Sequence, residues 1–153
     1  MPNEINLQKN INRQLDLLPL YVTEWYQSKV FAGRSKRTIY EYLHEYRRFF
    51  TWLIDADIVP VKNIKDIPLS ALENLSKADA ECFFIFLRER SLLNTNKPTT
   101  RSISEVTIHR TYRALSGLFK YLSEQTENGN GEPYFHRNVM KKLELKTKQK
   151  TTL

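Results

Sequence analysis

The sequence predicts an all-α fold. The chain holds only four glycines among 153 residues, and it has no long run of alternating apolar and polar residues. Several long segments instead repeat apolar residues at the 3.6-residue spacing of a helix. With 41% hydrophobic residues, the chain is long enough for one domain with a core. We therefore expect a single helical bundle with polar ends.

The first core helix is expected over residues 19–31. Pro19 suits a first helical turn, and Gly33 lies beyond the end as a stop signal. The preceding residues, 1–18, are polar and form an N-terminal extension that we expect to be partly helical or flexible.

A second helix is expected over residues 36–54, with Ser35 as its N-cap and Thr38 at the third helical position. Its inward stripe is Ile39, Leu43, Tyr46, Phe50 and Leu53. Residues 55–68 follow as an irregular connector that packs on the core.

A third helix is predicted over residues 77–90, because Ser76 and Asp79 resemble a capping box. This helix is apolar on much of its circumference and should be central. Cys82, the only cysteine, excludes an internal disulfide and is expected in the core.

A long fourth helix is expected over residues 105–125, after a loop at 94–102 and a cap at Ser104. Its apolar stripe is Ile108, Tyr112, Leu115, Phe119 and Leu122, and its opposite stripe is His109, Arg113, Ser116 and Lys120. Residues 133–143 are expected to add a short final helix.

The basic residues are unevenly distributed. The formal net charge is +7 and the pI is about 9.5, which favours a nucleic-acid or anionic-membrane partner. Basic residues outnumber acidic ones within 29–48, 97–120 and 136–153, whereas the reverse holds within 54–91. A surplus confined in this way is typical of a binding face.

The start of the second helix is the first candidate DNA contact. Positive side chains are unfavourable at a helix N-terminus, because that end of the helix dipole is itself positive. A bound phosphate would explain their presence. The alternative is an ordinary solvated helix start. The candidate residues are Arg34, Ser35, Lys36, Arg37, Thr38 and Tyr40.

The long helix is the second candidate, because the N-terminal half of a groove-inserted helix usually faces base edges. Arginine can pair with guanine, and threonine can touch a thymine methyl. A solvated basic face without a ligand is the alternative. The candidates are Thr107, His109, Arg110, Arg113 and Lys120, with Lys97 and Arg101 in the preceding loop.

No catalytic constellation is present in the sequence. The three histidines are scattered, and no glycine-rich phosphate loop or metal-ligand motif occurs. No apolar run approaches the ~18 residues that span a bilayer. We therefore expect no cofactor, metal, small-molecule substrate or membrane partner, and a cytoplasmic location.

Two series of residues resemble the amino-terminal core-binding domain of the tyrosine recombinases, the phage integrase family. One series is Ser35, Thr38, Tyr42, Leu43, Phe49, Phe50, Trp52 and Leu53. The other is Ser104, Thr107, Ile108, Arg110, Leu115, Leu118, Phe119, Tyr121 and Leu122. The longer phrases at 19–26, 38–52, 66–75 and 131–142 look like the XerS subclass of that family.

This resemblance implies a four-to-five-helix SAM-like bundle over residues 19–143. Residues 144–153 would then begin the linker to a catalytic domain that carries the cleaving tyrosine, and Lys141 and Lys142 would join the DNA contacts. The chain itself would not be an enzyme. Its first core helix, around residues 21–29, would contact a neighbouring subunit.

The function implied is DNA binding within a Xer-type site-specific recombinase that serves chromosome dimer resolution and chromosome partition at cell division. Its partners would be double-stranded DNA and other recombinase subunits. A helical module that offers its basic face to an acidic protein remains the alternative.

Overall fold

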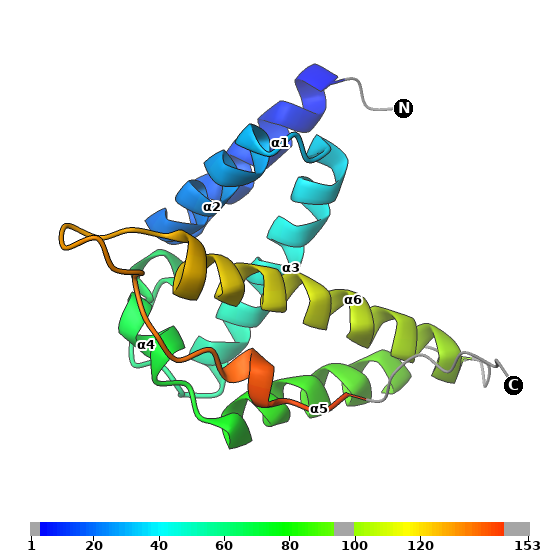
Figure 1. The fold of residues 1–153 in the computed structure, drawn as a ribbon. Helices are drawn as coiled ribbons and strands as arrows, with labels where there is room; N and C mark the ends of the chain where they lie inside the picture. The colour runs from blue at the N-terminus through cyan, green and yellow to red at the C-terminus, as the bar shows by residue number, and fades with distance from the viewer. Residues whose placement is uncertain (1–3, 94–99, 146–153) are drawn as a thin grey trace, which may run out of the picture.

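The computed structural model describes residues 4–93 and 100–145, which form an all-α fold without a strand (Figure 1). The fold class predicted from the sequence is confirmed. The helices are α1 (Glu4–Leu17), α2 (Leu20–Phe31), α3 (Lys36–Asp55), α4 (Leu69–Glu73), α5 (Lys77–Leu93) and α6 (Thr100–Lys120). Shorter turns are the 3-10 helices η1 (Ile64–Asp66) and η3 (Val139–Lys142) and the π-helical turn η2 (Tyr121–Gln125).

Helices α1 and α2 lie side by side, and α1 also packs against α3 (Figure 1). Residues 4–17 form a regular helix that buries Ile11 in the common core. Gly33 ends α2 with a φ of +79°, a value that glycine adopts without strain. The tight turn brings the Arg34 N–H within 3.0 Å of the Lys29 carbonyl oxygen.

The core lies where α3 crosses α6 (Figure 1). Ser35 caps α3 as predicted, because its hydroxyl accepts a hydrogen bond from the Thr38 N–H at 3.1 Å. All five residues of the expected inward stripe of α3 are buried. The Tyr46 hydroxyl donates to the Ala114 carbonyl oxygen at 2.9 Å, which ties the two helices together inside the core.

Helix α6 begins at Thr100, so the prediction of a cap at Ser104 is wrong. No glycine or proline lies between residues 100 and 105 to stop the helix, and the chain continues it in the N-terminal direction. Arg101 consequently lies on the first turn of α6, whereas Lys97 lies outside the described residues.

Helix α5 buries one face, made by Ala80, Phe83, Phe84 and Leu87. Cys82 is exposed, so its prediction as a core residue is wrong. It precedes Phe83 and points away from that face, because neighbouring residues in a helix are about 100° apart. The Ser76 hydroxyl accepts from the Asp79 N–H at 3.0 Å, which confirms the predicted cap.

Residues 132–142 form a strap that crosses α5 and α6, and we call it the C-terminal strap. It buries Phe135, Val139 and Met140, and only η3 within it is helical. The expected short helix over 133–143 is thus reduced to one 3-10 turn. Arg137 anchors the strap, because its Nη1 donates to the carbonyl oxygens of Glu73, at 3.0 Å, and Leu75.

None of the helices in the described residues combines the length and the apolar composition that a membrane crossing needs.

Candidate nucleic-acid interface

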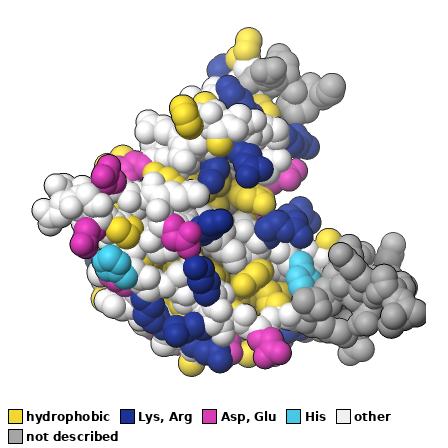
Figure 2. Space-filling model, in the orientation of Figure 1, with side chains coloured by type: hydrophobic (Ala, Val, Ile, Leu, Met, Phe, Trp, Pro, Cys, Tyr) yellow, Lys and Arg dark blue, Asp and Glu magenta, His cyan; other side chains and the backbone are white. Residues whose placement is uncertain are grey.

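A groove of about 320 Å³ opens between α2, the start of α3 and the middle of α6. Figure 2 shows Lys and Arg side chains on both sides of this hollow and hydrophobic side chains at its floor. We call it the cationic groove. Its lining residues are Trp25, Lys29, Arg34, Thr38, Ile39, Tyr42, Arg113 and Gly117.

Three cations of the groove have no acidic partner among the described residues, and the fourth, Lys120, acts on Glu124 through its charge without forming an ion pair. Lys29, Arg34 and Arg113 line it, and Lys120 lies close enough for its charge to act on Lys29. None of the four forms an ion pair with a described carboxylate. Like charges held together repel each other, and a bound anion relieves that repulsion.

Burial, followed by the charges of Arg34 and Lys120, lowers the pKa of Lys29 from its ordinary value of 10.5. Both causes lower this pKa, because burial and neighbouring cations disfavour the charged ammonium. A phosphate bound in the groove would raise the pKa of Lys29, because a negative charge favours the charged ammonium.

The floor of the groove is rigid and aromatic. Trp25 is 1% exposed, lies edge-on to Tyr46 with ring centroids 4.9 Å apart, and stacks on Tyr42 at 6.4 Å. Its indole N–H has no acceptor among the described residues. The cations therefore lie above a packed aromatic cluster.

The structure brings together only part of the residues predicted at the start of α3. Arg34 and Thr38 line the groove, and the Ser35 hydroxyl donates to the Thr38 hydroxyl at 2.9 Å. Tyr40 is half-buried outside the groove and lies edge-on to His44, with ring centroids 4.6 Å apart.

Lys36 and Arg37 are held by neighbouring side chains away from the groove. The Lys36 ammonium donates to Oε1 of Gln8 in α1 at 2.6 Å. The Arg37 guanidinium pairs with Glu41 at 3.6 Å on the exposed edge of α3.

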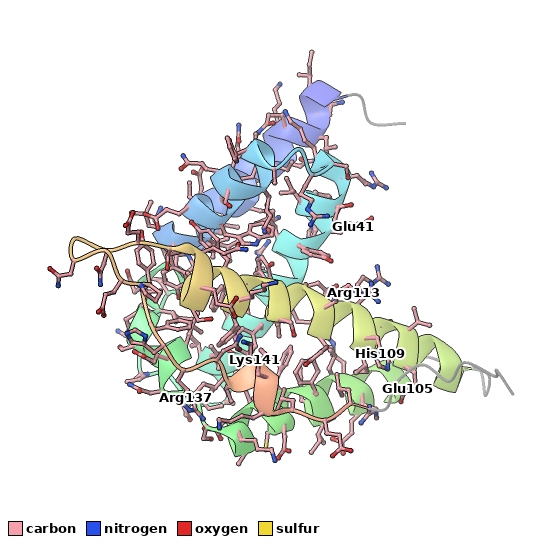
Figure 3. The ribbon with its side chains drawn as sticks, in the orientation of Figure 1. Glu41, Glu105, His109, Arg113, Arg137 and Lys141 are labelled. Carbon is pink, nitrogen blue, oxygen red and sulfur yellow. The ribbon has the colours of Figure 1, made fainter. Side chains whose placement is uncertain are left out.

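On α6, Arg113 and the exposed Arg110 lie three residues apart and therefore share a face of the helix. Figure 3 shows His109 and Arg113 projecting from α6, with Glu41 on the neighbouring α3. Thr107 is half-buried, and its carbonyl oxygen accepts from the Thr111 hydroxyl at 3.1 Å. The Arg101 side chain lies outside the described part of the structure.

One of the two lysines of the C-terminal strap that were predicted to contact DNA already has an acidic partner. Lys141 pairs with Glu124 at 2.9 Å, and this hydrogen bond lowers the pKa of the glutamate. Lys142 is exposed beside it.

Sequence reasoning missed Lys29 as a member of the site. The signal was present, because Lys29 and Arg34 flank the predicted helix stop at Gly33. A tight turn between two helices brings such flanking residues together.

Comparison with known proteins shows that the chain is similar to tyrosine recombinases. The chain is 53% identical over 151 residues to the tyrosine recombinase XerS of Streptococcus mutans serotype c. It is 52% identical over 151 residues to XerS proteins of two Streptococcus pneumoniae strains. Each alignment covers 99% of this chain and 42% of the relative.

No family model matches the chain, and no solved structure matches it. The chain thus spans 42% of the length of the curated relatives that it matches. By its similarity to XerS proteins over nearly its whole length, the chain belongs to the tyrosine recombinase family.

Proposed function

We propose that this chain is the N-terminal, DNA-binding core-binding region of a Xer-type site-specific recombinase, and that duplex DNA lies across the cationic groove. The observation that carries the proposal is a group of four neighbouring cations that form no ion pair with a described carboxylate, Lys29, Arg34, Arg113 and Lys120. The similarity to tyrosine recombinases supports DNA as the ligand.

A backbone phosphate is the ligand that best fits the groove. Arginine presents a planar fork of donors that matches phosphate oxygens, and lysine adds a compact point charge. The Arg34 guanidinium comes from the α2–α3 turn and that of Arg113 from α6, so the two would approach one phosphate from two sides. The Thr38 hydroxyl adds a neutral donor beside them.

The exposed face of α6 that carries Arg110 would lie along the duplex on one side of this phosphate. Arg110 and His109 lie toward the N-terminal half of α6 from Arg113, the half that commonly enters a major groove. We assign base contacts to this half of α6 and phosphate contacts to the groove.

In this role the chain holds half of a recombination site, beside other recombinase subunits, during chromosome dimer resolution. The family resemblance assigns strand cleavage to a separate domain, so the chain alone should bind DNA without cutting it. It would act on the bacterial nucleoid in the cytoplasm. Incubation with supercoiled plasmid and Mg²⁺ should yield no nicked product.

The direct test compares the wild-type chain with the Arg34→Gln/Arg113→Gln variant in a fluorescence anisotropy titration of a 30-base-pair duplex. Each phosphate contact contributes about −0.9 to the slope of log affinity against log salt. Loss of two contacts should reduce the slope by about 2 and weaken binding roughly 60-fold at ~0.1 M salt.

The matched control is Lys62→Gln/Lys77→Gln, which removes the same charge from exposed positions outside the cationic groove. It should change affinity by less than about twofold, because nonspecific steering depends weakly on distant charges in salt. Equal affinities of the two double variants would overturn the proposal.

A further inference from the structure

A second hollow with cationic walls lies on the other flank of α3. It has a volume of about 380 Å³ and opens between the second half of α3 and the C-terminal part of α5. We call it the α3–α5 pocket. Its lining residues are His44, Arg47, Arg48, Thr51, Trp52, Asp55, Phe86 and Arg90.

The charges of this pocket favour an anion. Three guanidinium groups and one carboxylate, that of Asp55, line the pocket. Arg90 forms no ion pair with a described residue, and the hydrogen bond that Arg47 donates to Oε1 of Gln14 is long at 3.5 Å. Only Arg48 is held by a carboxylate, that of the buried Glu45, at 3.1 Å.

The floor of the pocket is apolar. Trp52 and Phe86 lie with ring centroids 6.4 Å apart, and Phe86 is 37% exposed. A cationic rim above an apolar floor fits an anionic group attached to a less polar body. A phosphodiester with its deoxyribose has this character, because the sugar ring can pack on an exposed aromatic ring while the phosphate meets the arginines.

The spacing along α3 connects this pocket to the cationic groove. Thr38 in the groove and Arg48 in the pocket are ten residues apart, which corresponds to about 15 Å along a helix. The major groove of B-DNA is about 12 Å wide. The offset of the two sites along the α3 axis is therefore comparable to the width of a major groove.

The edge of α3 between the two sites is exposed. Arg37, Glu41 and His44 lie on it, and Figure 3 shows Glu41 projecting from α3 on the side of Arg113. No other described element covers these three side chains, which are all exposed. A duplex can therefore approach both sites at once.

We infer that the α3–α5 pocket holds a second phosphate of the same duplex, on the strand opposite the one in the cationic groove, so that α3 spans the major groove. This inference rests on the proposed function. It adds Arg47 and Arg90, which sequence analysis did not select, to the DNA contacts.

The test uses the Arg47→Gln/Arg90→Gln variant of the full 153-residue chain with the same duplex and salt series. We expect the salt slope to fall by about 2 and the affinity to fall roughly 60-fold at ~0.1 M salt. Arg90→Gln alone removes no described contact of the folded chain, and it should cost about 8-fold with a slope change of about 1.

The matched control is Lys62→Gln/Lys77→Gln. Lys77 lies on the first turn of the same helix as Arg90, thirteen residues away, or about 20 Å along the axis. Circular dichroism of each variant checks that the helical fold is retained.

A second measurement locates the two phosphates. Ethylation interference on a duplex that the chain selects from a random pool should show two clusters, one on each strand across one major groove. Arg90→Gln should abolish interference in one cluster and leave the other. A single cluster in the wild-type chain would overturn the inference.

The outcomes separate this inference from the proposed function. If Arg47→Gln/Arg90→Gln binds like the lysine control while Arg34→Gln/Arg113→Gln is weakened, the inference is wrong and the proposed function stands. If both double arginine variants bind DNA like the lysine control, the inference and the proposed function are both wrong. The same variants can also be titrated with poly-glutamate, a model acidic peptide. If Arg47→Gln/Arg90→Gln loses poly-glutamate binding but keeps its DNA affinity, the inference is wrong and the pocket binds an acidic peptide.

Discussion

The cationic groove and the C-terminal strap are both basic, but their cations have different surroundings. In the groove, Lys29, Arg34 and Arg113 have no carboxylate partner among the described residues. In the strap, Lys141 pairs with Glu124, and Arg137 donates to two backbone carbonyl oxygens.

This difference teaches that net charge along a sequence does not identify a binding face. A cation with a folded-state partner stabilises the protein, whereas a cation without one raises the free energy of the folded state through repulsion. The strap residues thus serve the fold, and the groove residues remain available to a ligand. Four predictions can break or sharpen this comparison.

The largest effect is expected for Arg137→Met. The substitution removes two charge-assisted hydrogen bonds and leaves the carbonyl oxygens of Glu73 and Leu75 without that donor. We expect the free energy of unfolding to fall by about 2–3 kcal/mol in urea denaturation. DNA affinity of the folded variant should be unchanged. A stable variant with weak DNA binding would reverse the roles assigned to the strap and the groove.

Arg113→Gln should weaken DNA binding and leave the stability of the fold intact, the reverse of what we expect for Arg137→Met. Loss of one phosphate contact should weaken DNA binding about 8-fold at ~0.1 M salt, which anisotropy can measure. The free energy of unfolding should stay the same or rise, because one of four neighbouring cations is removed. Lys77→Gln serves as the control, and a destabilised Arg113→Gln chain would show that this arginine supports the fold.

The pH dependence of binding should depend on Lys29. Its pKa is lowered in the free chain by burial and by the charges of Arg34 and Lys120. A bound phosphate favours the charged ammonium and raises that pKa, so DNA binding takes up protons. Affinity should therefore decrease as the pH rises from about 7 toward the ordinary value of 10.5.

Lys29→Arg provides the control for this prediction, because arginine keeps its charge over that range. The variant should bind with a flatter pH profile in anisotropy titrations from pH 7 upward. Identical profiles of the two chains would place Lys29 outside the DNA interface.

The smallest effect is expected for Lys141→Gln. Lys141 and Glu124 are both exposed, and such a surface pair contributes little to stability. We expect no measurable change in the urea midpoint and a change of less than about twofold in DNA affinity. A loss as large as that of Arg113→Gln would show that Lys141 leaves Glu124 for a phosphate.

Local patterns explain why most of the fold could be predicted. The inward stripe of α3 follows directly from apolar residues at helical spacing, and the Ser35 cap needs only a hydroxyl three residues before the Thr38 N–H. Helix α4 was missed because its five residues are too few to show a periodicity. Cys82 was misplaced because Ile85 and Phe86, also exposed, make α5 apolar outside its buried face.

The candidate site depends more on tertiary contacts. Lys36 was selected for its place at a helix start, but Gln8, 28 residues earlier, accepts its hydrogen bond. Lys29 joins the site only because α6 brings Lys120 and Arg113 against the α2–α3 turn. Such convergence leaves no periodic signal in the sequence. The DNA contacts themselves stay predictions.

The π-helical turn at Tyr121–Gln125 separates the part of α6 that lines the cationic groove from the strap. A π turn holds one residue more than an α turn, so it tolerates a change of length by one residue. Deletion of a single residue there would leave the arginines of α6 in place while rotating all later residues by about 100°. A change of length in this turn would therefore act on the packing of the strap and leave the register of the groove-lining residues of α6 unchanged.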